Sequence, residues 1–139
     1  MNKVQGEQHF RLSCISVIYY PQDGIAELIA DEGITLSAEH AREIFNLIEG
    51  LAMPPQAILV NRQNSYALSF EAFQLLSSYK GITALAILTH SRLAFLAAKF
   101  TRAKHYHIAV FMQREAALDW LRVKLNDDNS ANFNQDGAE

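Results

Sequence analysis

The sequence has little of what would fix a fold or an activity at once. Among its 139 residues are one cysteine, three prolines and no long uninterrupted apolar run. A lone Cys14 excludes an internal disulfide, and we expect it to be a small buried thiol in a strand. Without an apolar stretch of about 18 residues, no membrane insertion is expected. The net charge of −3 gives no basic field for nucleic acid or anionic membranes.

Catalytic and cofactor motifs are missing too. The chain contains no GxSxG, GxGxxG or P-loop pattern, so we expect no enzyme activity. A phosphoacceptor receiver domain needs an aspartate at the end of its third strand, where this chain has Val60 and Asn61. The N-terminal segment lacks the apolar region typical of a secretory signal. A cytoplasmic protein is therefore expected.

The composition is that of a globular protein. Half of the residues are hydrophobic and 19% are charged, which suits one compact domain of this length. We expect that domain to cover residues 8–125. The remaining residues, 126–139, are rich in asparagine and aspartate and are predicted to be a disordered tail.

Apolar periodicity predicts an α/β fold with a five-stranded mixed sheet and four helices. The turn at 21–24 predicts an antiparallel hairpin between the first two strands. The later strands alternate with helices, which favours parallel pairing. Ser37 and Ser69 are the expected N-caps of the first two helices. The predicted strands are 10–20, 24–30, 57–60, 82–88 and 106–112.

Two helices have specific faces that we expect to be buried. The second helix is predicted to point Phe70, Phe73, Leu76 and Tyr79 inward. The third, over 91–103, is predicted to bury Leu93, Leu96, Ala97 and Phe100. This leaves Phe95 on another side, where it would mark a dimer contact or a lipid-facing groove.

The order of elements resembles a known family through four segments: ITLSAEHAREIFNLIEGL, ILVNRQNSYALSFEAF, ITALAILTHSRLAFLAAKF and VFMQREAALDWL. It is similar to the SpoIIAA-like proteins, small bacterial relatives of the STAS domain of anti-sigma-factor antagonists, which also resemble the lipid-binding SEC14 fold. The likeness covers about residues 8–125 and is most specific at Phe111, Glu115, Ala117, Leu118, Trp120 and Leu121. It implies a superhelix of βα units, no cofactor, and a role in protein–protein regulation.

The resemblance also points to one serine. In antagonists of that type, a phosphorylated serine follows an aspartate at the start of the helix after the third strand. Ser69 occupies that place, but Leu68 precedes it. We favour Ser69 as a helix cap over a phosphosite, and whether Ser69 or the nearby Ser65 takes phosphate stays open.

Polar residues follow the three parallel strands and form a candidate rim for a ligand or partner, because open α/β sheets bind ligands at the carboxyl ends of their strands. Arg62 is the best single candidate, since a guanidinium holds an anion bidentately. Ordinary solvent-exposed loop ends are the alternative. The rim residues are Asn61, Arg62, Thr89, His90, Ser91, Arg92, Gln113 and Arg114.

His105 and His107 are spaced as two ligands on one strand face, with His90 as a third imidazole. No further ligand has suitable spacing, and His105 is expected to precede the strand, so no metal site is predicted.

Two functions follow as hypotheses. The first is a non-enzymatic regulatory or protein-interaction domain that forms a homodimer. The alternative is a carrier of a lipid or an anionic metabolite.

Overall fold

The computed structural model describes residues 6–98 and 102–138, without the side chains of 97–98 and 128–138. Its main sheet has the strand order β1-β2-β3-β5-β7-β8. The first three strands pair antiparallel and the others parallel, which confirms the predicted mixed sheet. The strands are β1 (Gln8–Arg11), β2 (Ile15–Tyr20), β3 (Ile25–Ala30), β5 (Ala57–Arg62), β7 (Ala84–Thr89) and β8 (His107–Phe111).

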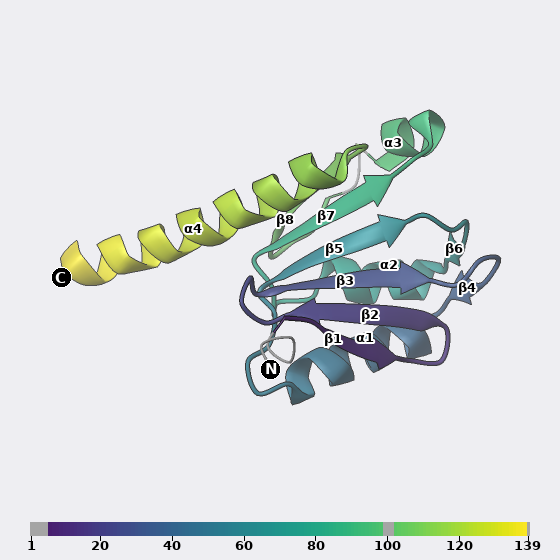
Figure 1. Cartoon of the computed structure of the whole chain (residues 1–139), viewed down its shortest axis with the longest axis horizontal. Helices are drawn as coiled ribbons and strands as arrows, with labels where there is room; N and C mark the ends of the chain where they lie inside the picture. Colours follow the sequence, from purple (N-terminus) through teal and green to yellow (C-terminus); the bar gives the residue numbers. More distant parts are fainter. Residues whose placement is uncertain (1–5, 99–101, 139) are drawn as a thin grey trace.

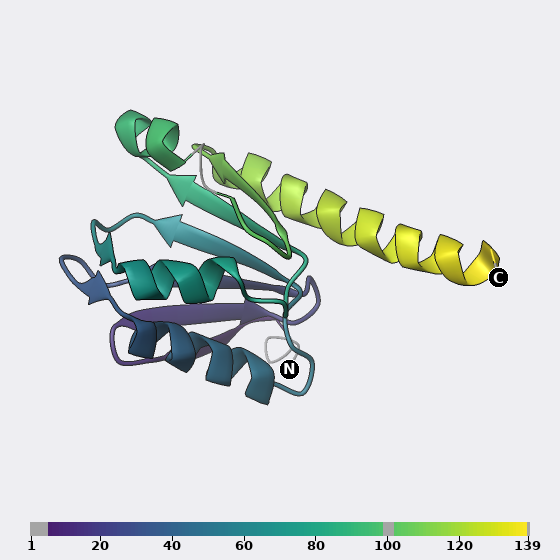
Figure 2. The same ribbon diagram turned by 180° about the vertical axis from the view of Figure 1, so that it is seen from behind.

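The described residues form four helices around this sheet. Helices α1 and α2 lie on one face, α4 crosses the other, and α3 lies beyond the end of β7 (Figures 1 and 2). A short parallel ladder of β4 (Thr35–Leu36) and β6 (Ala67–Leu68) stands apart from the main sheet. The α/β architecture with four helices is as predicted. The helices are α1 (Ala38–Gly50), α2 (Phe70–Ser77), α3 (Arg92–Ala98) and α4 (Arg114–Ala138).

Within the described residues the main sheet has six strands, where the sequence predicted five. The expected single strand over 10–20 is divided by a tight turn, in which the Leu12 amide donates to the Ile15 carbonyl at 2.9 Å. This turn reverses the chain, so that β1 pairs with β2. It also changes which residues face inward. The buried face of β2 is Ile15, Val17 and Tyr19, and Ile18 and Tyr20 alternate with them.

The turn between β2 and β3 agrees with the sequence. Gly24 has φ of 71°, a conformation that glycine adopts without a steric cost. The amides of Asp23 and Gly24 both donate to the Tyr20 carbonyl, at 3.1 and 3.0 Å. The predicted antiparallel hairpin is therefore confirmed.

The core has one apolar cluster on each face of the sheet. Under α1 and α2 lie the larger cluster's residues, including Cys14, Val17 and Ile58. On the opposite face, Ala117 and Leu121 of α4 are fully buried against strand residues that include several alanines. Small side chains on the strands let a helix approach the sheet closely. This packing holds the first turns of α4 in place.

Helix α3 does not bury the face that was predicted. Leu93 is 78% exposed and Leu96 is also exposed, whereas Phe95 is partly buried. The reason is tertiary: α3 sits past the strand ends instead of over the sheet (Figure 1). Phe100 lies outside the described residues.

Helix α4 extends to Ala138, which differs from the tail predicted over 126–139. Its first turns pack on the sheet, and the remainder projects past it in both views (Figures 1 and 2). None of the helices that the structure describes is long and apolar enough to cross a membrane.

Candidate functional site

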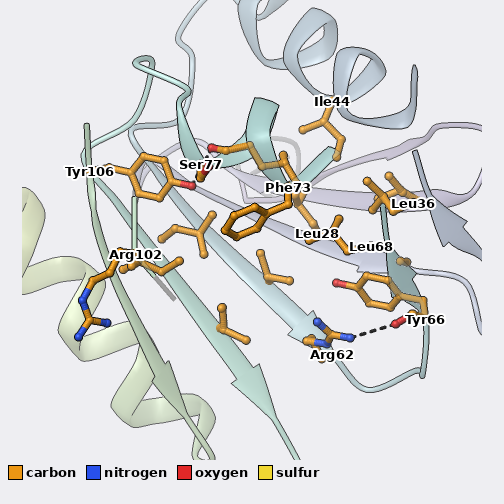
Figure 3. Close-up of a pocket in the computed structure, with 17 residues that line it drawn as sticks. Leu28, Leu36, Ile44, Arg62, Tyr66, Leu68, Phe73, Ser77, Arg102 and Tyr106 are labelled. Carbon is orange, nitrogen blue, oxygen red and sulfur yellow. Dashed lines mark hydrogen bonds between the residues drawn. The ribbon is translucent and has the colours of Figure 1, made fainter. Parts of the chain in front are cut away.

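A mostly apolar pocket lies between α2 and the sheet, with a volume of about 120 Å³. Its floor comes from the strands and its roof from α2, with Phe73 over the centre (Figure 3). Ser69 begins this helix by accepting a hydrogen bond from the Ala72 amide at 3.1 Å. Apolar walls with few polar groups are the usual make-up of a binding pocket. The apolar lining includes Leu28, Val60, Phe73, Leu76, Leu85 and Ile108.

Arg62 is the charged group at the end of this pocket nearest β6. Its guanidinium lies 4.3 Å from the centre of the Tyr66 ring, and Nη2 donates to the Tyr66 carbonyl at 3.1 Å (Figure 3). No carboxylate in the described part of the chain forms an ion pair with Arg62. Burial raises the pKa of Tyr66, while the positive charge of Arg62 opposes that shift. The pocket thus carries a half-buried cation held in place by an aromatic ring.

The polar residues at the opposite end of the pocket are Ser77, Arg102 and Tyr106 (Figure 3). The Tyr106 hydroxyl donates to the Leu76 carbonyl at 2.8 Å, which ties the segment before β8 to α2. Burial raises the pKa of Tyr106 to about 12, so this hydroxyl stays protonated. Arg102 lines the pocket with its stem, and its guanidinium points away from the centre (Figure 3).

A second polar cluster lies on the α4 face of the sheet, around Glu27. Only 3% of the Glu27 side chain is exposed, and Arg114 binds it bidentately at 2.6 and 2.9 Å. The Asn61 amide also donates to it, at 2.8 Å. Burial alone would raise the pKa of Glu27, but the hydrogen bonds from Arg114 and Asn61 outweigh it and the pKa is lowered. This cluster fastens the start of α4 to β3.

The chain is similar in fold to a solved structure. It is the crystal structure of an uncharacterized protein of the DUF3478 family with a SpoIIAA-like fold, from Shewanella loihica PV-4. The two chains share 21% identity with a TM-score of 0.48, over 84% of this chain and 92% of that one. No family model and no curated protein matches the sequence.

The predicted rim residues do not converge on one site. Arg62 lines the pocket, whereas its neighbour Asn61 and Arg114 lie on the opposite face beside Glu27. Adjacent residues of a strand point to opposite faces, so Asn61 and Arg62 cannot share a site on this sheet. Gln113 precedes α4 and is exposed.

The loop after β7 belongs to neither cluster. His90, Ser91 and Arg92 are exposed. Ser91 caps α3 by accepting from the Ala94 amide at 3.2 Å. Thr89 is buried, and its hydroxyl oxygen accepts from the Ser91 amide at 3.3 Å. These contacts shape the loop and leave His90 directed to solvent.

The two candidate phosphosites also lie outside the pocket lining. Ser69 is partly buried and acts as the N-cap of α2, with its amide bonded to the Leu36 carbonyl. Ser65 is exposed, and its amide donates to a carboxylate oxygen of Glu32 at 2.9 Å. A phosphate on Ser65 would therefore meet a negative charge.

The histidine pair borders a separate shallow depression. His105 precedes β8, as expected, and His107 begins it; both are exposed. Lys104 and Tyr106 share this depression. The described residues contain no group of three side chains placed to hold a metal ion.

Sequence reasoning missed Glu27, Tyr66 and Tyr106. A signal existed for Glu27: it is the one charge within the apolar strand IAELIA, and a buried acid requires a partner. The tyrosines gave no comparable signal, because their places in the pocket depend on loops that approach α2 from distant parts of the chain.

Proposed function

We propose that this chain is a non-enzymatic, cytoplasmic protein-interaction domain of the SpoIIAA-like or STAS-like type, which binds a partner at the mouth of the pocket beneath α2. The observation that carries this proposal is an apolar pocket with large apolar residues exposed around it. Leu68 and Phe73 line the pocket and are exposed, and Phe70, one helical turn before Phe73, is 68% exposed. Phe70 was predicted to point inward. Clustered exposed apolar residues around a pocket are typical of protein interfaces.

The size of the pocket favours a single side chain as its occupant. Its volume of about 120 Å³ is close to the roughly 150 Å³ of an apolar cavity that binds benzene. Pockets for larger small molecules have volumes of about 300–1,000 Å³. One aromatic or branched side chain from a partner suits this space, in the manner of an interface anchor.

The chemistry of the lining supports a binding role. The described lining residues include no carboxylate, imidazole or thiol. Tyr106 is engaged with a carbonyl and has a pKa of about 12, far above the range of an efficient acid or base at neutral pH.

Site-specific crosslinking tests the proposal. A photoreactive amino acid is placed at Phe70, and in a matched control at Met53, which is also exposed but lies in the loop before β5. In cells of the source organism, we expect a discrete protein adduct from position 70 and none from position 53. The adduct should disappear when Leu68→Glu is added. Equal labelling from both positions would contradict the proposal.

A homodimer is also part of the proposal. The exposed Leu93 and Leu96 on α3 offer a second apolar surface, and we expect them to bury against another copy. Sedimentation equilibrium should give a dimer for the wild type and a monomer for Leu93→Glu. A wild-type protein that stays monomeric at all concentrations would contradict the proposed homodimer.

The second candidate function is a small-ligand carrier for a lipid or an anionic metabolite. The apolar lining with Arg62 in its wall favours it. Native mass spectrometry against both ligand classes would show retained ligand if the chain is a carrier, and its absence would favour the protein partner.

A further inference from the structure

The chemistry of Arg62 indicates what the partner carries at the pocket. We propose that the partner inserts one aromatic or branched apolar side chain beneath α2 and places an adjoining carboxylate against the guanidinium of Arg62. This inference rests on the proposed function, because it names the chemistry of the segment that the pocket binds.

The first support is the unmet bonding capacity of Arg62. A guanidinium has five N–H donors in a planar fork, and one of them is used by the Tyr66 carbonyl. In the described part of the chain no carboxylate forms an ion pair with it. By contrast, Arg11 and Arg114 are each paired with a carboxylate of β3 or its end, Asp31 and Glu27 respectively.

The second support is the position of the guanidinium. It is held over the Tyr66 ring at 4.3 Å, so little side-chain freedom remains to be lost on binding. Its surroundings are apolar, and an ion pair formed beside apolar walls is stronger than one in open water. Since Arg102 points its charge away (Figure 3), a single carboxylate matches the site.

The third support is that the charge and the apolar side chains line the same small pocket. Arg62 and Phe73 both belong to the lining of a space of about 120 Å³. An occupant therefore needs its acid within one residue of its apolar group. A fatty acid meets the charge requirement but not the size limit, whereas a Phe-Asp or Leu-Glu step in a protein meets both.

Two matched peptides test this. Acetyl-Phe-Asp-amide and acetyl-Phe-Asn-amide differ only in the charge next to the aromatic ring, and decanoate represents a lipid. Binding is measured by ligand-detected NMR at neutral pH. For the wild type we expect the Asp peptide to bind about tenfold more tightly than the Asn peptide, as for a charge-assisted hydrogen bond.

Substitutions at Arg62 test whether this residue causes the preference for the Asp peptide. Arg62→Met should abolish the difference between the peptides while keeping weak binding of both, and Arg62→Lys should restore part of it. Arg92→Met is the matched control, because Arg92 is exposed at the start of α3 and outside the pocket lining. It should leave the tenfold ratio unchanged. The ratio in the wild type is itself a test that needs no variant.

Each contrary result has a distinct meaning. Equal binding of the two peptides by the wild type overturns the acidic partner and leaves the apolar pocket as a binding site. Tighter binding of decanoate than of the Asp peptide overturns it in favour of a lipid. If no probe binds, both this inference and the proposed function fail.

Discussion

At the scale of single residues, Glu27 places a negative charge in the middle of an apolar strand, where an unpaired carboxylate would cost several kcal/mol. Arg114 and Asn61 offset that cost by donating three hydrogen bonds to it. The pair also joins two elements that are remote in sequence. Removing one partner should therefore cost more than breaking an ordinary surface ion pair, because it leaves the other charge buried.

Arg114→Met should be strongly destabilising, because it leaves the Glu27 charge buried without its main partner. We expect a loss of about 3 kcal/mol in the free energy of unfolding, measured by urea denaturation at neutral pH. The control is Arg122→Met on the same helix, which removes an exposed pair with Asp119 and should cost less than about 1 kcal/mol. Similar losses in both variants would contradict a special role for the buried pair.

The same pair predicts a dependence on pH. The pKa of Glu27 is lower in the folded protein than its ordinary value of 4.5. Its stabilisation is therefore fully present above that ordinary value and is lost as the pH falls through the folded-state pKa. In Glu27→Gln this part of the acid sensitivity should be absent, as measured by urea midpoints from neutral pH to about pH 2. If Glu27→Gln had the same dependence of stability on pH as the wild type, Glu27 would not be a source of the acid sensitivity.

The sequence predicted the position of some of the charged and polar residues correctly and of others incorrectly. Arg62 was the first choice at the strand ends, and it does line the pocket. Asn61 and Arg114 were placed at the same rim, but the alternation of strand faces moves them to Glu27. The alternation of side chains along β5 could be predicted from the sequence. The pairing of Arg114 with Glu27 could not, because it depends on where α4 crosses the sheet.

At the scale of elements, substitutions at Ser69 test whether this residue serves as the N-cap of α2. Ser69→Ala should cost about 1 kcal/mol of unfolding free energy, because it removes the acceptor for the Ala72 amide. Ser69→Asp keeps an acceptor and suits the helix N-terminus, so it should stay within about 0.5 kcal/mol of the wild type. Ser65→Ala, in the exposed loop, is the control and should be neutral. A neutral Ser69→Ala would contradict the capping role.

The elements that the sequence predicted well are those with local signals. The N-caps Ser37 and Ser69 and the turn at Gly24 are all present in the structure, because each acts on its own few residues. The turn after β1 carries neither glycine nor proline, and the alternating pattern continues through it, so one strand was predicted where two exist. The position of α3 was also unpredictable, since its apolar residues fit a sheet face that it does not cover.

At the scale of the whole molecule, the part of α4 that projects past the sheet lies away from the packed core. Helices in proteins owe most of their stability to packing of an apolar face, and the packed part of α4 lies in its first turns. Removing residues 128–139 should therefore change the free energy of unfolding by less than about 0.5 kcal/mol. Urea denaturation of the full and shortened chains measures this. A loss above 1 kcal/mol would show that the segment packs on the domain.

The bond between Glu27 and Arg114 spans 87 positions of the chain, which has a consequence for the order of folding. The β1–β3 meander is made of neighbours in sequence, so closing its loops costs little entropy. Arg114 reaches Glu27 only after β5, β7 and β8 have been added beside β3. The contact should therefore form after the rate-limiting step. Its loss would appear as faster unfolding, with the folding rate nearly unchanged in a stopped-flow chevron.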